Sequence, residues 1–597
     1  MMAGQHSLKR FYEDVQGRAE AFLKENYNAL PLDDITDGGK AYKIDLKVNC
    51  NLKNVGIILG LPFNFPDCLP TVSVEKDIFK KIYPIPHLNS EMVLCTFDVH
   101  EVIPNANNPE GIIKEILKRA RDNLEKGIKG LNKEDFIDEY SAYWDQDVQG
   151  IYYSIVPPSD KAELICLFKY KDDDNEGGIF AKSRLHAKNW LENFRGNCTE
   201  GKTITALYLP IKGFGYPPFP KANKDIYTRL KENDSDNLKE LMKFLRDNDR
   251  PSYILFSLPL QQGFFFGAWK HNKPYKEEAI GTKRKIIKHS KGFRPGKAPV
   301  ELELIRDFPK NPVSLLQITR ADKERLYFRG GDDIAPLNDL SVSVIGCGSI
   351  GSNLADKLVK IGVNQICLVD DEKLSFDNVT RHLCGASYVG KHKTKAVQDL
   401  LQKHYPHLKV TTEEKGIIEL LIENQGYLNK FDLSIVAIGN TAIEFRLNHL
   451  VKSSLIKSPM LFVWVEPYLA AGHAVYINPN NKGCLRCLFD QDLFFQERVL
   501  KNPRHYTRRE AGCQTTFIPY GALGIDNYLA ELAKFIIKVC GGGLTKNTVF
   551  TWLGNLSEMR KKNRTLQSKW VGKSNYQAYE EIILDKFLLC EDCQLEV

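Results

Sequence analysis

The chain has 597 residues and a formal net charge of +7 at pH 7. A chain of this length is expected to form roughly three or four domains, and its modest charge gives no indication of a nucleic-acid partner. The longest apolar runs, such as Met460–Val465, are far too short to cross a bilayer, and no N-terminal apolar segment has the form of a signal peptide. We therefore expect a cytoplasmic protein without membrane contact, whose 14 cysteines stay reduced.

Residues 1–145 are expected to form a small α+β domain. The patterns predict an amphipathic helix, three strands and a second helix, at about 7–26, 43–48, 54–59, 71–75 and 111–126. Before the second helix, the proline-rich segment Tyr83-Pro-Ile-Pro-His87 leads into a coil segment that carries Cys95.

This order of elements resembles the ubiquitin-conjugating fold. That family has a His-Pro-Asn motif, with the Asn eight residues before a cysteine. Here Pro86 and His87 hold the Pro-Asn positions, and His87 precedes Cys95 by the same spacing. The resemblance implies that Cys95 is a nucleophile that accepts an acyl group by thioester exchange. His87 would either donate a hydrogen bond to the thioester oxyanion or serve as part of the flap scaffold.

Residues 146–312 are expected to form a mixed α/β connecting domain whose chemistry the sequence does not name. Strand-like runs at 164–170, 203–209 and 253–258 alternate with amphipathic stretches such as 237–246, and the aromatic run 264–269 is expected in the core. A basic run at 282–289 is expected to be a solvated face.

A glycine-rich motif follows the predicted strand Ser341–Ile345. It reads Gly346-x-Gly348-x-x-Gly351, a helical pattern follows at 352–361, and Asp370 ends a second predicted strand nineteen residues after the last glycine. Glycines allow a tight turn close to phosphate, a helix N-terminus favours the anion, and the acid can accept ribose hydroxyls. By itself the motif predicts a nucleotide-binding β-α-β unit, and an NAD-dependent dehydrogenase is one interpretation of it.

The residues after Asp370 favour adenylation chemistry instead. Asn378, Arg381 and Lys393 add polar and positive groups, which a dehydrogenase does not need but which would offset charge on ATP and on a pentavalent transition state. This resembles the Rossmann-like adenylation domain of the ubiquitin-activating superfamily, of ThiF/MoeB type, over roughly 315–597, and we expect that domain at 313–597.

The resemblance implies ATP and Mg²⁺ as cofactors. It implies that Asp370 holds the ribose and that Asn378, Arg381 and Lys393 line the phosphates, with Lys395 as the alternative to Lys393. The family carries an acid after the next strand that supports magnesium, whereas this chain has Gly439 there. The magnesium ligand therefore stays open, with Asp370, Asp371 or solvent as alternatives.

Two C-x-x-C pairs, Cys484 with Cys487 and Cys590 with Cys593, point to a metal. Four thiolates make a closed tetrahedral zinc site of the structural kind, provided that the fold brings the pairs together. In the resembled family, the first pair joins a C-terminal C-x-x-C in this way. Redox chemistry at one pair is the weaker alternative.

Cys513 follows Arg508 and Arg509 and precedes a predicted helix at about 525–539. The resemblance places it on the crossover loop above the nucleotide, where relay members carry a reactive cysteine. The two arginines would favour its thiolate. The alternative is a small polar loop residue.

Conjugating and activating domains in one chain resemble the fused proteins of bacterial CBASS antiphage operons. That resemblance implies adenylation of the C-terminus of a cGAS-like nucleotidyltransferase, a thioester relay from Cys513 to Cys95, and amide formation with a target protein or a small-molecule amine. It also implies a homodimer, with Arg325 and Arg329 as candidates to cross between protomers. Two rival hypotheses are a sulfur-carrier adenylyltransferase without a relay and a non-catalytic ATP-binding module that recognises a partner.

Overall fold

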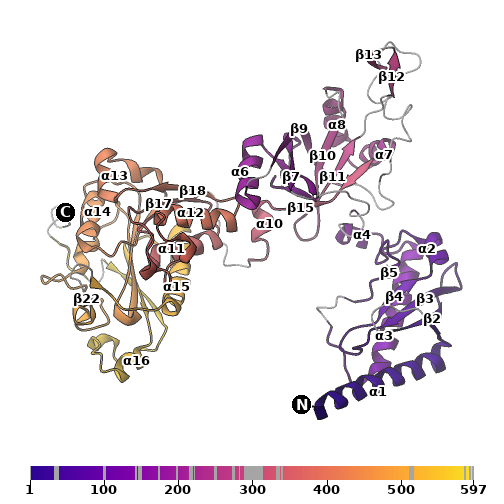
Figure 1. Ribbon diagram of the computed structural model, residues 1–597, viewed down its shortest axis with the longest axis horizontal. Coiled ribbons are helices and arrows are strands. Elements are labelled where there is room, and N and C mark those ends of the chain that lie inside the picture. The colour runs from indigo at the N-terminus through magenta and orange to yellow at the C-terminus, as the bar shows by residue number, and fades with distance from the viewer. Residues whose placement is uncertain are drawn as a thin grey trace. The chain divides into compact units, whose positions relative to one another are not determined.

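The computed structural model describes residues 2–32, 39–97, 102–140, 144, 151–172, 175–196, 199–213, 220, 222–247, 252–271, 276–280, 283–287, 313–330, 337, 340–509, 516–583, 587–590 and 593. The chain divides into two compact units, Met1–Ala187 with Thr199–Ala321, and Lys188–Cys198 with Asp322–Val597. Figure 1 shows the chain, with many of its helices and strands labelled.

The N-terminal part of the first unit is an antiparallel sheet packed against two long helices. The sheet has the order β1-β2-β3-β4-β5, and its strands are Leu30–Leu32, Lys40–Lys47, Asn54–Leu61, Thr71–Val74 and Val93–Leu94. The helices are α1 (Met2–Tyr27), α2 (Lys76–Ile82), α3 (Pro109–Lys129) and α4 (Asp135–Asp138). Apolar positions of α1 and α3 share one buried core with the sheet, as their helical spacing requires. The predicted helix–strands–helix order is confirmed.

The second part of this unit contains an eight-stranded sheet with the order β14-β11-β10-β9-β7-β8-β6-β15. Its strands are β6 (Ile151–Ser154), β7 (Glu163–Asp172), β8 (Asn175–Ala181), β9 (Thr199–Pro210), β10 (Ser252–Pro259), β11 (Phe264–His271), β14 (Ser314–Leu316) and β15 (Ile318–Arg320). The helices are α6 (Arg184–Arg195), α7 (Asn223–Asn233) and α8 (Ser235–Asp247), and a hairpin joins β12 (Lys276–Ile280) to β13 (Lys283–Ile287).

The aromatic run 264–269 lies in β11, where Phe266 and Trp269 are buried, so the prediction that it forms core is confirmed. Tyr140 and Trp144 pack into the same core as Trp269, whereas Phe266 lies in a second cluster. The indole of Trp144 donates a hydrogen bond to the carbonyl oxygen of Leu316 at 3.1 Å.

The second unit is built on an eight-stranded sheet with the order β18-β17-β16-β19-β20-β21-β24-β25. These strands are Lys409–Glu413, Gln365–Val369, Ser341–Ile345, Leu433–Val436, Met460–Val465, Ala471–Ile477, Thr548–Leu553 and Ala578–Ile582. The first five are parallel and the last three are antiparallel to their neighbours. β16 is buried on both faces, by Val342, Val344 and Ile345 and by the buried Ser343, whose hydroxyl donates to that of Ser434 at 2.8 Å.

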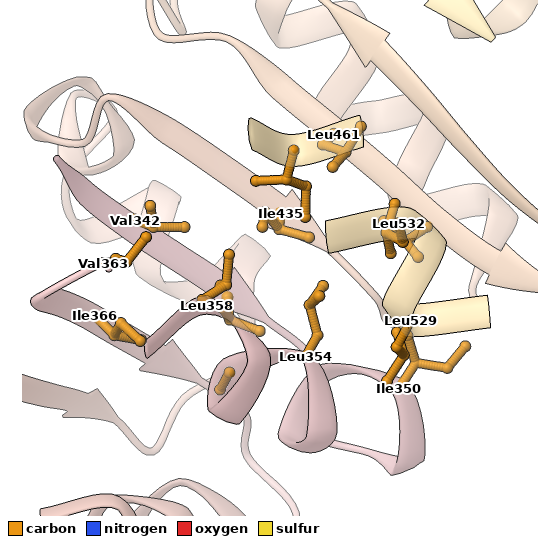
Figure 2. Close-up of a cluster of buried hydrophobic side chains, with 14 of the residues drawn as sticks. Val342, Ile350, Leu354, Leu358, Val363, Ile366, Ile435, Leu461, Leu529 and Leu532 are labelled. Atoms are coloured by element: carbon orange, nitrogen blue, oxygen red, sulfur yellow. The ribbon is translucent and has the colours of Figure 1, made fainter. Parts of the chain in front are cut away.

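Helices cover both faces of this sheet. They are α10 (Lys323–Tyr327), α11 (Ser349–Lys360), α12 (Lys393–His404), α13 (Ile417–Glu423), α14 (Thr441–Lys452), α15 (Ala522–Cys540) and α16 (Leu556–Lys561). Figure 2 shows how α11 and α15 meet the strands, through Ile350, Leu354, Leu358, Leu529, Leu532, Val342, Ile435 and Leu461. Helices α13 and α14 contribute to a separate buried cluster. Each of these large side chains contributes about 1.5–3 kcal/mol on burial, so the sheet is a rigid base for the loops at its carboxyl edge.

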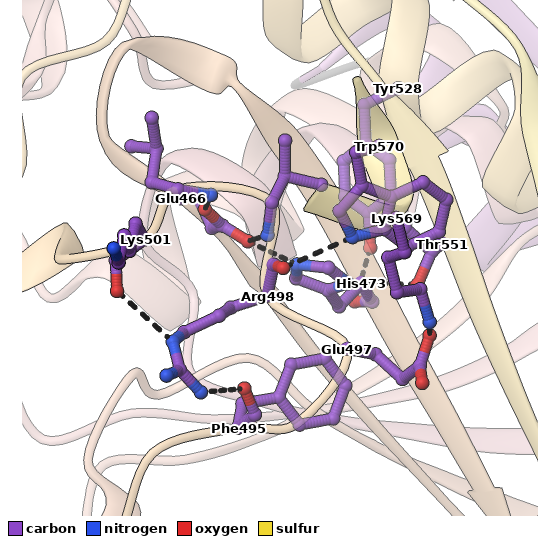
Figure 3. Close-up of polar contacts among 12 residues, drawn as sticks. Glu466, His473, Phe495, Glu497, Arg498, Lys501, Tyr528, Thr551, Lys569 and Trp570 are labelled. Atoms are coloured by element: carbon purple, nitrogen blue, oxygen red, sulfur yellow. Dashed lines mark hydrogen bonds and ion pairs between the residues drawn. The ribbon is translucent and has the colours of Figure 1, made fainter. Parts of the chain in front are cut away.

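A buried polar network holds the segment 497–501 against the antiparallel strands (Figure 3). The Glu466 carboxylate contacts the His473 ring at 2.8 Å and accepts the backbone N–H groups of Val499 and Leu500 at 2.6 and 2.8 Å. The other ring nitrogen of His473 contacts the Thr551 hydroxyl at 3.0 Å. Because both carboxylate oxygens have partners, this carboxylate is buried without an unsatisfied oxygen.

Candidate functional site

The glycine turn after β16 has a shape that only glycine permits at two positions. Gly346 has a φ of +92°, and an added Cβ there would lie 2.7 Å from the carbonyl oxygen of Ala437. At Gly351 an added Cβ would lie 1.8 Å from the carbonyl oxygen of Gly346. Gly348 is the N-cap of α11. The turn therefore presents backbone at a helix N-terminus, where an anion is favoured.

Asp370 follows β17 and is tied to this turn. Its carboxylate accepts the backbone N–H of Cys347 at 2.7 Å and that of Glu372 at 2.8 Å. Burial raises the pKa of Asp370 above its ordinary value, while these two hydrogen bonds act against the shift. A carboxylate has about four lone-pair sites, so two remain for the hydroxyls of a ligand.

A cavity of about 190 Å³ lies where β16, β17 and β19 end. It brings together four of the predicted residues, namely Gly346, Gly348, Asp370 and Lys393. Asp371, an alternative magnesium ligand in the sequence analysis, also lines the cavity, as do two charged residues that the sequence did not point to, Glu372 and Lys415. The carboxyl edge of an open parallel sheet is the usual place for a nucleotide.

Lys393 is the first residue of α12, and its side chain is only 6% exposed. Its ammonium group forms an ion pair with the Glu372 carboxylate, and its backbone N–H donates to the carbonyl oxygen of Glu372 at 2.9 Å. A buried ammonium needs a negative partner. The cavity therefore holds a cation that phosphate oxygens can share with Glu372. Lys395, the alternative to Lys393, is exposed and does not line the cavity.

Asn378 and Arg381 lie in the loop between β17 and α12 and are not among the residues that line the cavity. The side-chain oxygen of Asn378 accepts hydrogen bonds from the backbone N–H and hydroxyl of Ser375, both at 3.1 Å. The guanidinium of Arg381 lies over the ring of Tyr520, 5.0 Å from its centroid. The backbone oxygen of Arg381 accepts from the Asn353 amide at 2.9 Å, which fixes this loop to α11.

Tyr520 is a functional candidate that the sequence did not reveal. Its hydroxyl contacts the Ser349 hydroxyl at 2.7 Å, at the first residue of α11. Because the same ring lies under Arg381, Tyr520 joins the chain segment before α15 to the glycine turn and to the Arg381 loop. The contact spans 171 residues, and no local motif signals it.

Gly439 stands after β19 with a φ of +70°, and an added Cβ would meet open space. The backbone conformation, and not a lack of space, therefore disfavours an acid at this position. Nearby, Glu444 lies in the first turns of α14 and is 6% exposed. Burial raises its pKa to about 7, although backbone hydrogen bonds from Gly439 and Asn440 lower it.

Cys513 lies outside the described residues. The short strands on either side of it, β22 (Arg508–Arg509) and β23 (Thr516–Phe517), pair antiparallel. The Arg508 guanidinium donates to the Tyr468 hydroxyl at 3.2 Å. The candidate inter-protomer arginines, Arg325 and Arg329, are both exposed.

Cys95 follows β5 and is exposed. Its backbone N–H donates to the carbonyl oxygen of His87 at 2.7 Å, and its thiol contacts the carbonyl oxygen of Phe97 at 3.7 Å. The Asn123 amide, from α3, donates to the carbonyl oxygen of Cys95 at 2.9 Å. Both sides of this loop are therefore fixed, while Cys95 itself is exposed.

His87 has a φ of +65°, and its ring lies between two carboxylates. Nε2 is 3.1 Å from Asp135, and Nδ1 is 2.6 Å from Glu139. The hydrogen bond to Glu139 is the largest cause that raises the pKa of His87, although burial opposes it. A charged imidazolium has two N–H groups, and both are used here. This arrangement favours the scaffold role over donation to an oxyanion.

The two C-x-x-C pairs come together. The sulfur atoms of Cys484, Cys487, Cys590 and Cys593 all lie within 4.8 Å of one another, and the set is largely buried. The backbone N–H of Cys590 also points to the sulfur of Cys487 at 3.4 Å. Four sulfur donors at this spacing fit a tetrahedral zinc ion.

Fold and sites together define the class. The chain joins a conjugating-type α+β domain to a Rossmann-like, nucleotide-binding adenylation domain through a mixed α/β region. Residues 322–572 match the ThiF family, and residues 18–151 match the prokaryotic E2 family B. The predicted fold class is confirmed. In the described part of the chain, no helix is long and apolar enough to span a membrane.

Some relatives are similar to this chain over most of its length. The chain is 21% identical over 524 residues to the ATP-dependent ubiquitin transferase-like protein Cap2 of Escherichia coli (strain TW11681), covering 81% of this chain and 82% of that protein. It is 22% identical to the protein of the same name from Pseudomonas aeruginosa, covering 73% and 76%. Ubiquitin-like modifier-activating enzyme 5 of Caenorhabditis briggsae is 23% identical over 26% of this chain and 38% of that enzyme.

The resemblance to fused conjugating and activating proteins is therefore confirmed. The chain is an ATP-dependent enzyme of the ubiquitin-like activating and transferase type.

Proposed function

We propose that this enzyme activates the C-terminal carboxylate of a partner protein with ATP and conjugates it to an amine through two cysteine thioesters. The observation that carries the proposal is the cavity at the glycine turn, where Asp370 and Lys393 meet, in one chain with the exposed Cys95. The partner is a cGAS-like nucleotidyltransferase, as the resemblance to CBASS proteins implies.

In the first step, a carboxylate oxygen of the partner attacks the α-phosphorus of ATP. The bond to the bridging oxygen breaks, pyrophosphate leaves and an acyl adenylate remains. Lys393, Asn378 and Arg381 offset the charge of the phosphates and of the transition state, while Asp370 binds the ribose. Asn378 and Arg381 do not line the cavity, so their side chains must change conformation to reach the phosphates, while Asn353 holds the backbone of their loop on α11.

Mg²⁺ neutralises phosphate charge when it is bound with the triphosphate. Of the carboxylates that line the cavity, Asp370 accepts two backbone N–H bonds and Glu372 pairs with Lys393. Asp371 also lines the cavity and has no ion pair among the described residues. Its carboxylate therefore fits the metal better than the other two.

The next steps move the acyl group without further ATP. The thiolate of Cys513 attacks the acyl carbon and AMP leaves; the thiolate of Cys95 then attacks the new thioester and releases Cys513. A target amine attacks the Cys95 thioester, loses a proton and releases the thiolate, which yields an amide. Asn123 and His87 hold the loop of Cys95 through backbone hydrogen bonds.

Two further assignments complete the proposal. Cys484, Cys487, Cys590 and Cys593 hold a structural zinc ion, supported by their spacing and burial. The activating domains pair as a homodimer, with the exposed Arg325 and Arg329 as candidates to reach the other protomer.

ATP–pyrophosphate exchange tests the activation step. The purified protein, Mg-ATP and the partner nucleotidyltransferase should incorporate labelled pyrophosphate into ATP, and a partner that lacks its C-terminal residue should not support exchange. Exchange in the parent protein with no thioester on Cys95 or Cys513 and no amide conjugate would favour the sulfur-carrier adenylyltransferase. ATP binding without any exchange would favour the non-catalytic module.

A further inference from the structure

The region between the two enzymatic parts contains a second cavity, of about 300 Å³. Four neighbouring strands of its sheet, β9, β7, β8 and β6, contribute the lining. It is larger than the cavity at the glycine turn and is at the lower end of the volume that small-molecule sites have.

The cavity is positively charged. Lys169, Lys171 and Lys202 line it, against one carboxylate, that of Glu176. Glu176 pairs with Lys171 at 3.0 Å, and both of these side chains are more than 70% exposed. Among the described residues, Lys169 and Lys202 have no carboxylate within ion-pair distance. Two ammonium groups are thus left for an anion.

A β-bulge lies beside Lys169. Phe168 pairs with Thr203 and Tyr170 with Glu200, so Gly201 and Lys202 of β9 together oppose Lys169, and β9 carries the extra residue. An added Cβ at Gly201 would lie 1.9 Å from the carbonyl oxygen of Lys169, so only glycine fits. Bulges re-aim a side chain and are frequent beside functional sites.

Aromatic rings supply flat surfaces next to this charge. The Lys169 ammonium lies 5.1 Å from the ring centroid of Tyr253, a contact that holds the amine in place. Tyr152 is half-buried and lines the cavity. Its ring lies 3.0 Å from where a Cβ of Gly178 would stand, so a glycine lets the ring rest on the sheet.

We propose that this cavity binds a mononucleotide, with its phosphates between Lys169 and Lys202 and its base against the ring of Tyr152. Ammonium groups suit the phosphates as point charges, and any of the bases can stack on an aromatic ring. The connecting region is then a nucleotide-sensing part of the chain, separate from the ATP site that the activation step uses.

Lysine footprinting on the full-length protein tests this site directly. The protein is treated briefly with acetic anhydride, with and without ADP, and acylation at each lysine is read by mass spectrometry. At a concentration about ten times the Kd, a covered amine should react roughly tenfold more slowly. We expect this protection at Lys169 and Lys202, and none at Lys239, an exposed lysine of α8.

Lys415 reports on the other cavity, since it lines the glycine-turn site. Protection of Lys415 without protection of Lys169 and Lys202 would overturn the inference and leave the proposed activation untouched. Protection of Lys169 and Lys202 should also be lost in Tyr152→Ala, while Lys169→Gln should abolish protection of Lys202. Equal protection by inorganic phosphate would show that the base is not recognised, and protection only by an acidic peptide would likewise refute a mononucleotide site.

Discussion

Replacing Glu444 with glutamine should make the activating domain more stable at neutral and alkaline pH. Glu444 is 6% exposed, and its Oε1 has no hydrogen-bond partner among the described residues. Burial raises its pKa from the ordinary 4.5 to about 7. The folded protein therefore holds this proton over a range in which the unfolded chain has lost it.

The sign and size of the change in folding stability follow from the difference between the two pKa values of Glu444. Below pH 4.5 both states are protonated and the carboxyl costs nothing. Between pH 4.5 and about 7 the unfolded chain ionises while the folded protein keeps the proton, so stability falls by about 3 kcal/mol for a shift of this size and changes little above pH 7. Glutamine keeps the shape and does not titrate. Between pH 5 and pH 8 the advantage of Glu444→Gln over the parent should therefore grow by about 2–3 kcal/mol.

Hydrogen exchange in β19 and β20 reports the stability of this sheet without assuming that the whole chain unfolds at once. The opening free energies of the parent and of Glu444→Gln are compared at pH 5 and pH 8, after correction for intrinsic exchange rates. Glu419→Gln, which changes an exposed carboxylate of α13, is the matched control and should show no such growth. If the opening free energies of the parent and of Glu444→Gln differ by the same amount at both pH values, Glu444 is not a buried group with a raised pKa.

Three further predictions address the sites. Tyr520→Phe loses the contact with Ser349 but keeps the ring under Arg381. Since such a hydrogen bond is worth about 1 kcal/mol, the rate of pyrophosphate exchange should fall about fivefold. The double variant with Ser349→Ala should show no further fall, whereas additive losses would mean that the two hydroxyls act separately. Gly351→Ala places a Cβ 1.8 Å from a backbone oxygen and should abolish ATP exchange, while Gly385→Ala, where nothing lies within 4 Å, should exchange normally. Cys484→Ser should release zinc, measured with a chromogenic chelator, and lower the melting temperature of the activating domain, because structural zinc contributes on the order of 10 kcal/mol to folding. Retention of a full zinc equivalent would exclude the four-cysteine site. Cys50→Ser is the control.

Short-range motifs could be predicted from the sequence, because spacing alone determines their geometry. The glycine turn and the end of the next strand bring Gly346 and Asp370 together in any β-α-β unit. Cys484 and Cys590 lie 106 residues apart, and the family resemblance, not their spacing, predicted that the two C-x-x-C pairs meet. The helices α1, α3 and α15 follow from their apolar periodicity, with ends that differ by a few residues.

Contacts between distant segments could not be predicted in this way. The Tyr520 hydroxyl meets Ser349 across 171 residues, and the carboxylate of Asp135 meets His87 across 48. Neither pair has a spacing that signals it, because tertiary packing alone decides which loops meet. The burial of Glu444 has the same origin. A glutamate in the first turns of a helix is usually solvated and favoured by the helix dipole, and only the packing of α14 removes it from water.

The order of thioesters is the central claim and can be measured directly. The protein, Mg-ATP and the partner nucleotidyltransferase are mixed and analysed on non-reducing and reducing gels, beside Cys95→Ala and Cys513→Ala. We expect a thiol-sensitive adduct in the parent, an adduct that accumulates on Cys513 in Cys95→Ala, and none in Cys513→Ala. An adduct on Cys95 in the absence of Cys513, or no thiol-sensitive adduct in a parent protein that does exchange pyrophosphate, would contradict it.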